Sequence, residues 1–290
     1  MSTQVTEAQV REYAGNVQLL LQQQGSVLAD KVGTGTHVGS GAVPADQVGS
    51  VTAVRRTTRH ADTPLVNTPH ARRWVFPVDY EVADLLDHQD MMRLLADMKG
   101  PYAQSQAFAL GRAKDSEIIT ALDATATTGE NQGSTEAFDA TNFGQVSGAT
   151  GLTILKLRTA LLQMMRANVQ VDREKLYFVM SAQQHDDLLA DIQVTSRDFN
   201  SSPVLVEGRI RYYMGMEFVI TQLLPLTAAG GDRSCFLFAK SGVHLGMWGS
   251  DSRISERDDK SYSWQVYSAL TCGATRLEQG KVCRVLCDEP

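Results

Sequence analysis

Several signatures of enzymes, membrane proteins and secreted proteins are missing from this chain. Its 290 residues contain no GxSxG, no HExxH, no GKS or GKT phosphate loop and no CxxC pair, so an enzyme hypothesis has no named catalytic residue. No apolar run approaches the ~20 residues that span a bilayer. The start, MSTQVTEAQVREY, has neither the basic residues nor the hydrophobic core of a secretion signal. We therefore expect a non-enzymatic protein without a membrane segment or signal peptide.

Cysteine and histidine are scarce, and neither forms a metal-binding pattern. All four cysteines lie in the last fifth of the chain, and the closest pair, Cys283 and Cys287, is wider than the tight pairs of structural zinc sites. On one strand these two residues share a face, which favours small, buried, reduced side chains over a zinc site. The six histidines show no ligand spacing. We expect no metal, no cofactor and no catalytic site.

What the chain does have is an arginine-rich stretch at residues 55–80, RRTTRHADTPLVNTPHARRWVFPVDY. Residue types that suit strands flank it at 51–54 and 73–80, while Pro64 and Pro69 exclude regular structure between them. The pattern predicts a long two-stranded arm with a proline-stiffened tip. Such a hairpin is marginal in water by itself, so we expect another surface to cover it.

Charge indicates the kind of surface. Residues 55–73 hold five arginines and one acid, a local charge of +4, so the rest of this chain of net charge −6 carries −10. A basic arm on an acidic body is complementary to a second copy of that body. Arginine runs also bind phosphates, so a nucleic-acid-binding arm is the alternative.

Four runs carry a resemblance to a known family: RHADTP, NTPHARR, DYEVADLLDHQD and GPYAQSQAFALGRAKDSEI. They resemble the major capsid protein of tailed double-stranded DNA bacteriophages. The resemblance implies the α+β tailed-phage capsid fold, with an extended β-hairpin loop that lies across a neighbouring subunit. The implied parts are an N-terminal arm (1–47), the extended loop (48–82), a peripheral domain (83–170) with a spine helix (101–123), an axial domain (171–250) and closing strands (251–290).

The same resemblance implies the function. We expect self-assembly into pentamers and hexamers that form an icosahedral head around double-stranded DNA, which is contacted non-specifically. The expected partners are further copies of the chain, scaffolding and portal proteins, and decoration proteins, with assembly in the bacterial host cytoplasm. An encapsulin-like compartment and a nucleic-acid-binding oligomer are the alternatives. Residues 48–80 contain no lysine, so we expect no lysine crosslink from this loop.

Two groups of residues are candidates for the contact between subunits. On the loop they are Arg55, Arg56, Arg59, His60, Leu65, Asn67, His70, Arg72, Arg73 and Trp74. The candidate acidic partner face comprises Asp84, Asp87 and Asp90. On a helix, Asp84, Asp87 and His88 would share one face, and a divalent metal there is the alternative to a solvated or docking surface.

Periodicity predicts the remaining elements. Helical spacing is found at residues 6–24, 101–123, 152–167 and 182–191, and His185, Asp186 and Asp187 are interpreted as the solvent face of the last of these helices. The glycine-rich residues 31–43 suit a flexible or strand-edge linker more than a phosphate loop, and residues 125–150 suit a polar loop. Strand patterns occur at 175–180, 208–221, 234–239, 252–257, 262–272 and 282–287.

Overall fold

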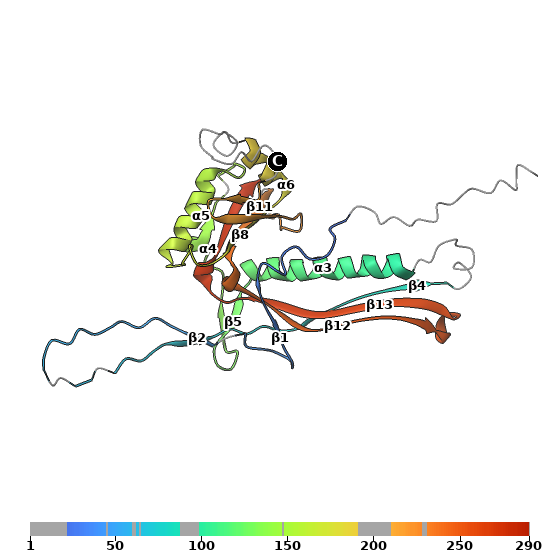
Figure 1. Ribbon diagram of the computed structural model, residues 1–290, viewed down its shortest axis with the longest axis horizontal. Helices are drawn as coiled ribbons and strands as arrows, with labels where there is room; N and C mark the ends of the chain where they lie inside the picture. The colour runs from blue at the N-terminus through green and yellow to red at the C-terminus, as the bar shows by residue number, and fades with distance from the viewer. Residues whose placement is uncertain are drawn as a thin grey trace, which may run out of the picture. The chain divides into compact units, whose positions relative to one another are not determined.

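The computed structural model describes residues 22–44, 46–59, 62–63, 65–87, 99–146, 148–190, 210–227 and 231–289. The chain forms two compact units, the first comprising residues 1–26, 79–113 and 249–271 and the second the remainder. Three long elements contribute residues to both units: α3 (Lys99–Asp123), β12 (Val243–Arg257) and β13 (Ser263–Arg276) (Figure 1). The helix predicted at residues 6–24 lies almost wholly outside the described residues.

The first unit contains most of α3 and most of the strands β4 (Val78–Leu86), β12 and β13. β4 and β1 (Gly33–Thr36) are the two edge strands of a sheet of order β1-β12-β13-β4, and β1 belongs to the second unit together with the part of β12 that pairs with it. The helix α3 runs along this sheet (Figure 1), and the buried Gln106 side chain donates a hydrogen bond to the carbonyl oxygen of Val266 at 3.0 Å. The long helix predicted at 101–123 is confirmed. Its start, Gly-Pro, suits the first turn of a helix because proline lacks only a donor that has no partner there.

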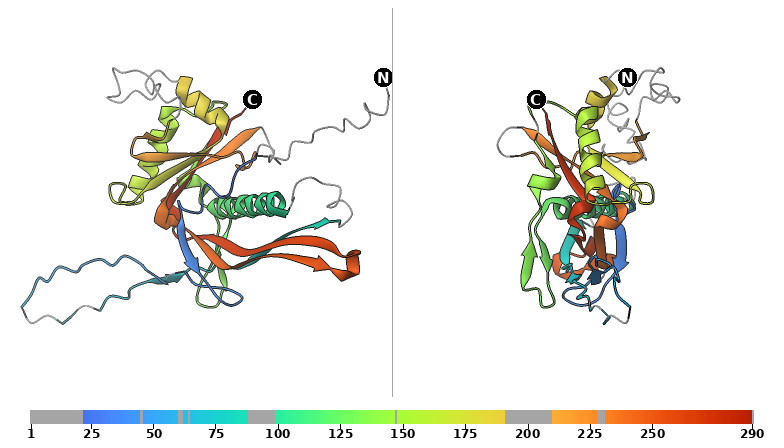
Figure 2. Two further views of the ribbon diagram at one scale, coloured as in Figure 1. Left: turned by 45° about the vertical axis from the view of Figure 1, so that its right-hand side comes forward. Right: turned by 90° about the vertical axis from the view of Figure 1, so that its left-hand side faces the viewer.

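The second unit is built on a six-stranded sheet of order β7-β14-β11-β8-β10-β9 (Figure 2). β8 (Leu176–Met180) is buried at every position, because β10 (Met216–Ile220) pairs with it in parallel and β11 (Asp232–Ala239) in antiparallel register. β14 (Val282–Asp288) pairs with β11 and β7 (Gly144–Gln145), and β9 is Tyr212–Tyr213. All four cysteines are free and buried, and Cys283 and Cys287 share the inner face of β14, as predicted.

Two helices pack on this unit through predicted apolar stripes. α5 (Ile154–Arg166) begins after the N-cap Thr153 and buries Ile154, Leu157, Ala160 and Met164 at helical spacing. α6 (Ala182–Ala190) buries Gln184 and Leu188. The prediction that residues 185–187 form a solvent face is right for Asp186 alone. His185 Nε2 accepts from the backbone N–H of Ile210, and Asp187 accepts from that of Leu152, so both bind their own chain.

The segment that precedes β1 is held by α3. A Cβ on Gly111 would approach the carbonyl carbon of Gly25 to 2.5 Å, so glycine allows the two backbones to meet. Further along α3, the fully buried Asp115 carboxylate accepts from the backbone N–H groups of Val27 at 3.0 Å and Leu28 at 3.1 Å. These contacts fix the point from which the chain enters β1.

Three predicted segments differ in the structure. Residues 78–86 form the strand β4, so the helical face drawn through Asp84 and Asp87 is wrong. Residues 51–54 form no strand. The paired strands of the arm are instead β2 (Asp46–Val48) and β3 (His70–Arg72). The polar stretch 125–150 contains a hairpin, β5 (Ala126–Thr128) and β6 (Ser134–Glu136), followed by α4 (Ala140–Phe143) and β7.

The glycine-rich linker has the role of an edge strand. Residues Gly33–Thr36 form β1, which pairs in parallel with His244–Met247 of β12. The strand-edge interpretation of residues 31–43 is therefore confirmed. Among the described residues, no helix is long and apolar enough to cross a membrane.

Candidate functional site

The arginine-rich arm is a long loop on a short β-ladder. β2 and β3 pair Asp46 with Arg72, Gln47 with Ala71 and Val48 with His70, and the N–H of Gly49 donates to the carbonyl oxygen of Pro69 at 2.7 Å. Beyond that bond the described residues form no ladder. Figure 2 shows residues beyond β2 and β3 as one open loop, drawn in blue. A hairpin is present as predicted, but the prediction of a long two-stranded arm with strands at 51–54 and 73–80 is wrong, because only the short strands β2 and β3 pair.

The far part of this loop exposes apolar and basic side chains together. Leu65 is 96% exposed, and Val54 and Val51 are 63% and 55% exposed. Arg55, Arg56, Arg59 and Asn67 are exposed as well, while His60 lies outside the described residues. Exposed apolar side chains rimmed by charge mark interaction surfaces in soluble proteins. We call Val51, Val54, Arg55, Arg56, Arg59, Leu65 and Asn67 the loop tip.

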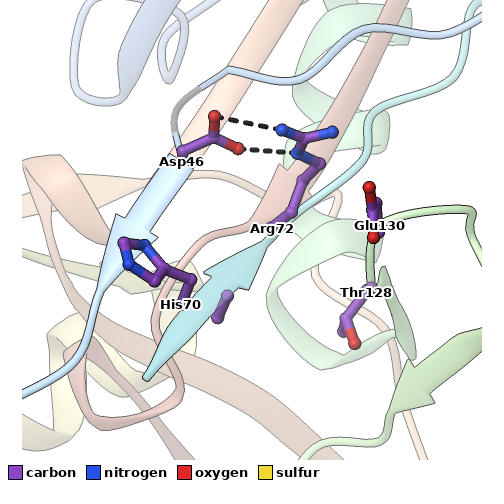
Figure 3. Close-up of a pocket in the computed structure, with 7 residues that line it drawn as sticks. Asp46, His70, Arg72, Thr128 and Glu130 are labelled. Atoms are coloured by element: carbon purple, nitrogen blue, oxygen red, sulfur yellow. Dashed lines mark hydrogen bonds and ion pairs between the residues drawn. The ribbon is translucent and has the colours of Figure 1, made fainter. Parts of the chain in front are cut away.

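At the base of the loop the arginines bind their own chain. Arg72 makes a two-pronged ion pair with Asp46, with Nε–Oδ1 and Nη2–Oδ2 distances of 2.6 and 3.1 Å (Figure 3). Hydrogen bonding from Arg72 holds the pKa of the Asp46 carboxyl below its usual value. A cavity of about 440 Å³ beside this pair is lined by His70 and Arg72 and, from the β5–β6 hairpin, by Thr128 and Glu130 (Figure 3).

Arg73 is buried and Trp74 is half-buried, and both bind their own chain. Arg73 is 7% exposed, its Nη2 binds Glu136, and its Nε donates to the carbonyl oxygen of Leu277 at 2.9 Å. The Trp74 indole N–H donates to the carbonyl oxygen of Gly129 at 2.8 Å. Both side chains therefore fasten the base of the loop to the β5–β6 hairpin, and their part in the contact between subunits stays a prediction.

The predicted acidic face is divided by the strand. Asp84 is half-buried and accepts a hydrogen bond from Gln106 at 3.0 Å, whereas Asp87 is exposed. His88 and Asp90 lie outside the described residues. Over the part of the chain that the structure describes, no group of three or more histidine, cysteine, aspartate or glutamate side chains could hold a metal ion.

Sequence reasoning missed the β5–β6 hairpin, which positions Arg73 and Trp74. A signal was present: two threonine-containing runs flank residues 129–133, GENQG, a spacing that suits a hairpin. Gly129 takes a φ of +90°, which glycine adopts readily. The partners Glu136 and Gly129 could not be found from spacing, because they lie more than 50 residues from the loop in sequence.

Comparison with known proteins shows to which family this chain belongs. A family model described as phage capsid protein matches residues 5–289. The chain belongs to this family. The predicted structural role, without enzymatic activity, is that of the family. No curated protein matches the sequence.

Solved structures show the same fold for this phage capsid protein. The capsid structure of cyanophage P-SCSP1u matches with a TM-score of 0.75 at 16% identity, covering 100% of this chain and 96% of that one. A structure from Mycobacterium phage Che8 matches with a TM-score of 0.71 at 16% identity over 96% and 97% of the two chains. The capsid of cyanophage Pam1 matches at 0.70 with 14% identity, over 98% and 97%.

The predicted α+β tailed-phage capsid fold is thus confirmed. The protein is a major capsid protein, the subunit of an icosahedral phage head. The encapsulin-like compartment and the nucleic-acid-binding oligomer are not favoured.

Proposed function

We propose that the loop tip is the part of this capsid protein that binds a neighbouring subunit. The observation that supports it is the exposure of Leu65, 96%, on a loop that has no ladder beyond Gly49 among its described residues. An extended segment of this kind loses conformational entropy when it is ordered, so it needs apolar burial against another surface. A second copy of the chain supplies that surface in a head built of many copies.

Charge supports the choice of partner surface. Arg55, Arg56 and Arg59 bring three positive charges to the loop tip, while β4 and the residue after it carry Asp79, Glu81 and Asp87 on exposed positions. Complementary charge favours docking in one orientation and raises the association rate. We propose β4 of the next subunit as the docking surface, with Asp87 and the predicted contact residue Asp90 at its end.

The larger assembly follows from this contact. A loop that binds a different surface on the next copy makes a head-to-tail contact, which closes into rings when the rotation allows. We propose pentamers and hexamers of this kind, with residues 1–47 as arm, 48–82 as extended loop, 83–170 and 171–250 as peripheral and axial domains, and 251–290 as closing strands. The further proposed partners are scaffolding, portal and decoration proteins and packaged DNA. We propose that assembly takes place in the host cytoplasm.

Charge reversal at the loop tip tests the proposal. Arg55, Arg56 and Arg59 are all replaced by glutamate, and particles are counted by negative-stain microscopy and sedimentation. We expect soluble, folded subunits with unchanged circular dichroism and a loss of closed shells of about tenfold or more, since reversed charge repels the acidic surface. Replacement of the same three residues by lysine is the matched control, because it keeps charge and length, and it should still form shells. Normal shells from the glutamate variant would refute the docking of the loop tip.

A further inference from the structure

Two histidines that the capsid function does not use meet at the edge of the four-stranded sheet, within the second unit. His37, directly after β1, and His244, at the start of β12, place their Nε2 atoms 2.9 Å apart. Their ring centroids are 5.1 Å apart. The difference between the two distances is about the sum of the two ring radii, so both Nε2 atoms lie close to the line that joins the ring centres. The nitrogens therefore point at one another, as in a hydrogen bond, rather than converging on a common third point as ligands of one metal ion do.

Glycines on both paired strands, Gly35 of the GTGTHVG run and Gly246 of β12, make room for this pair. A Cβ on Gly35 would lie 3.0 Å from Cε1 of His244, and a Cβ on Gly246 would lie 2.8 Å from Cδ2 of His37. The Trp248 ring covers His37 at 5.4 Å between centroids, and its indole N–H donates to the carbonyl oxygen of Gly39 at 2.7 Å. The motif thus serves a packed pair of imidazoles.

The pair lies between β1 and β12, close to the base of the extended loop. The backbone N–H of His37 donates to the carbonyl oxygen of Met247 at 2.8 Å, which ends the β1–β12 ladder. A few residues later, Ala42 forms a bridge with Val75 at the base of the extended loop. A break between His37 and His244 would therefore loosen both β1 and the strand that leads into the loop.

Protonation acts on this contact in two steps. With one added proton, one ring still donates an N–H and the other ring nitrogen still accepts, so the bond survives. With a second added proton both rings are charged, and two N–H groups and two positive charges face each other at 2.9 Å. The bond cannot persist in that state.

The surroundings do not offset this repulsion. Burial first and then the charge of His37 lower the pKa of His244 to about 4. The other charged groups nearby are engaged elsewhere: Lys240 of the turn before β12 donates to the carbonyl oxygen of Asp30, and Lys31, ahead of β1, pairs with Asp30 and Glu217. On β13, Arg276 donates to the carbonyl oxygens of Leu122 and Ala124. No described carboxylate pairs with either imidazole.

We propose that His37 and His244 form an acid-sensitive latch that holds β1 on β12 and opens when both rings are protonated. The direction follows from linkage. A histidine whose folded pKa is depressed favours the closed state above its ordinary value of 6.5, and the closed state is lost as pH falls toward about 4. Opening of β1 should then rise by about tenfold per pH unit in this window, on the order of 100-fold in all.

Hydrogen exchange of the full-length protein tests the latch. The amide of His37 and the peptide spanning residues 33–37 are followed between pH 7 and pH 4, with rates corrected for the intrinsic effect of pH. We expect opening to increase on the order of 100-fold in the natural protein. His244→Gln removes the second proton site while keeping a side chain that can donate and accept, so its profile should be flat.

Two further variants complete the experiment. His70→Gln, an exposed histidine of the same unit, should retain the acid response of the natural protein. His37→Gln should weaken the acid response, because the charge of His37 is removed while the burial of His244 remains, and it replaces His244→Gln if that variant does not fold. An acid response that is unchanged in the folded His37 or His244 variant would overturn the proposal, as would a natural protein whose β1 exchange does not respond to pH.

Discussion

The two halves of the arginine-rich loop have similar composition and opposite environments. At its base, Arg72 pairs with Asp46, and the 7%-exposed Arg73 binds Glu136 and the carbonyl oxygen of Leu277. At the tip, Arg55 and Arg59 are exposed, and no described carboxylate pairs with either. Arginine content alone therefore does not mark an interface. The β5–β6 hairpin supplies partners at the base, whereas the described residues of the tip are exposed, and we propose that a neighbouring subunit covers them.

The largest expected effect comes from disrupting the close backbone contact between β13 and the segment that follows the base of the loop. A Cβ on Gly273 of β13 would collide with the carbonyl oxygen of Phe76, a few residues after β3. Gly273→Val should lower the free energy of unfolding by more than about 3 kcal/mol, because the backbone must separate. Urea unfolding measures this. Gly133→Ala, where a Cβ meets nothing within 4 Å, should change stability little, and a Gly273→Val variant as stable as the natural protein would contradict the close backbone contact.

Removal of the buried arginine should have the next largest effect. Arg73→Ala leaves Glu136 without this donor and the carbonyl oxygen of Leu277 with Gln47 as its remaining donor, which should cost about 2–3 kcal/mol of unfolding free energy. The same urea titration measures it. If Arg73 were instead a contact between subunits, the variant would lose shells while its unfolding curve stayed in place, and the division between base and tip would fail.

The buried cysteines report whether a loop change reaches the core. Burial raises the pKa of Cys272 to about 11 and that of Cys283 to about 12. Because the thiolate is the reactive form, both should stay protonated and resist iodoacetamide at about pH 8 in the folded protein, and react on unfolding. Mass spectrometry counts the modified residues. Tip variants should keep this protection, whereas Gly273→Val should lose it; rapid labelling of a tip variant would show that the tip supports the fold.

The smallest effect is expected at the exposed ion pair of the base. Arg72→Ala removes the pair with Asp46, which lies at the surface and is screened by solvent and salt. The thermal midpoint should stay close to that of the natural protein, and the small difference should vanish in about 1 M salt. A large drop that persists in high salt would show that Arg72 carries the stability assigned here to Arg73.

Much of the fold was predictable where periodicity and burial agree. The stripe of α5 and the fully apolar β8 follow from their own residues, and the proline-containing tip excluded regular structure at the correct place. β4 was misread because its apolar–acidic alternation, clear over residues 78–82, is reversed at the end, where Asp84 lies on the half-buried face and Leu85 is exposed. Only tertiary structure shows that Asp84 meets Gln106 and that Asp87 does not share its face.

The candidate site was predictable as a segment and less so by residue. Charge and prolines located the loop, and the exposure of Leu65 and Arg55 agrees with that prediction. Arg73 could not be separated from Arg72 by sequence, since neighbouring residues of a strand point to opposite faces and only the inward one finds Glu136. The histidine pair was equally hidden, because its members stand 207 positions apart.

Hydrogen exchange of the free subunit and of the assembled shell tests most directly whether the loop tip binds a neighbouring copy. We expect the amides of residues 50–68 to exchange fast in the subunit and to become protected in the shell, while those of residues 70–74, which already bind their own chain, change little. Equal, fast exchange of residues 50–68 in both states would contradict the binding of the loop tip to a neighbouring copy.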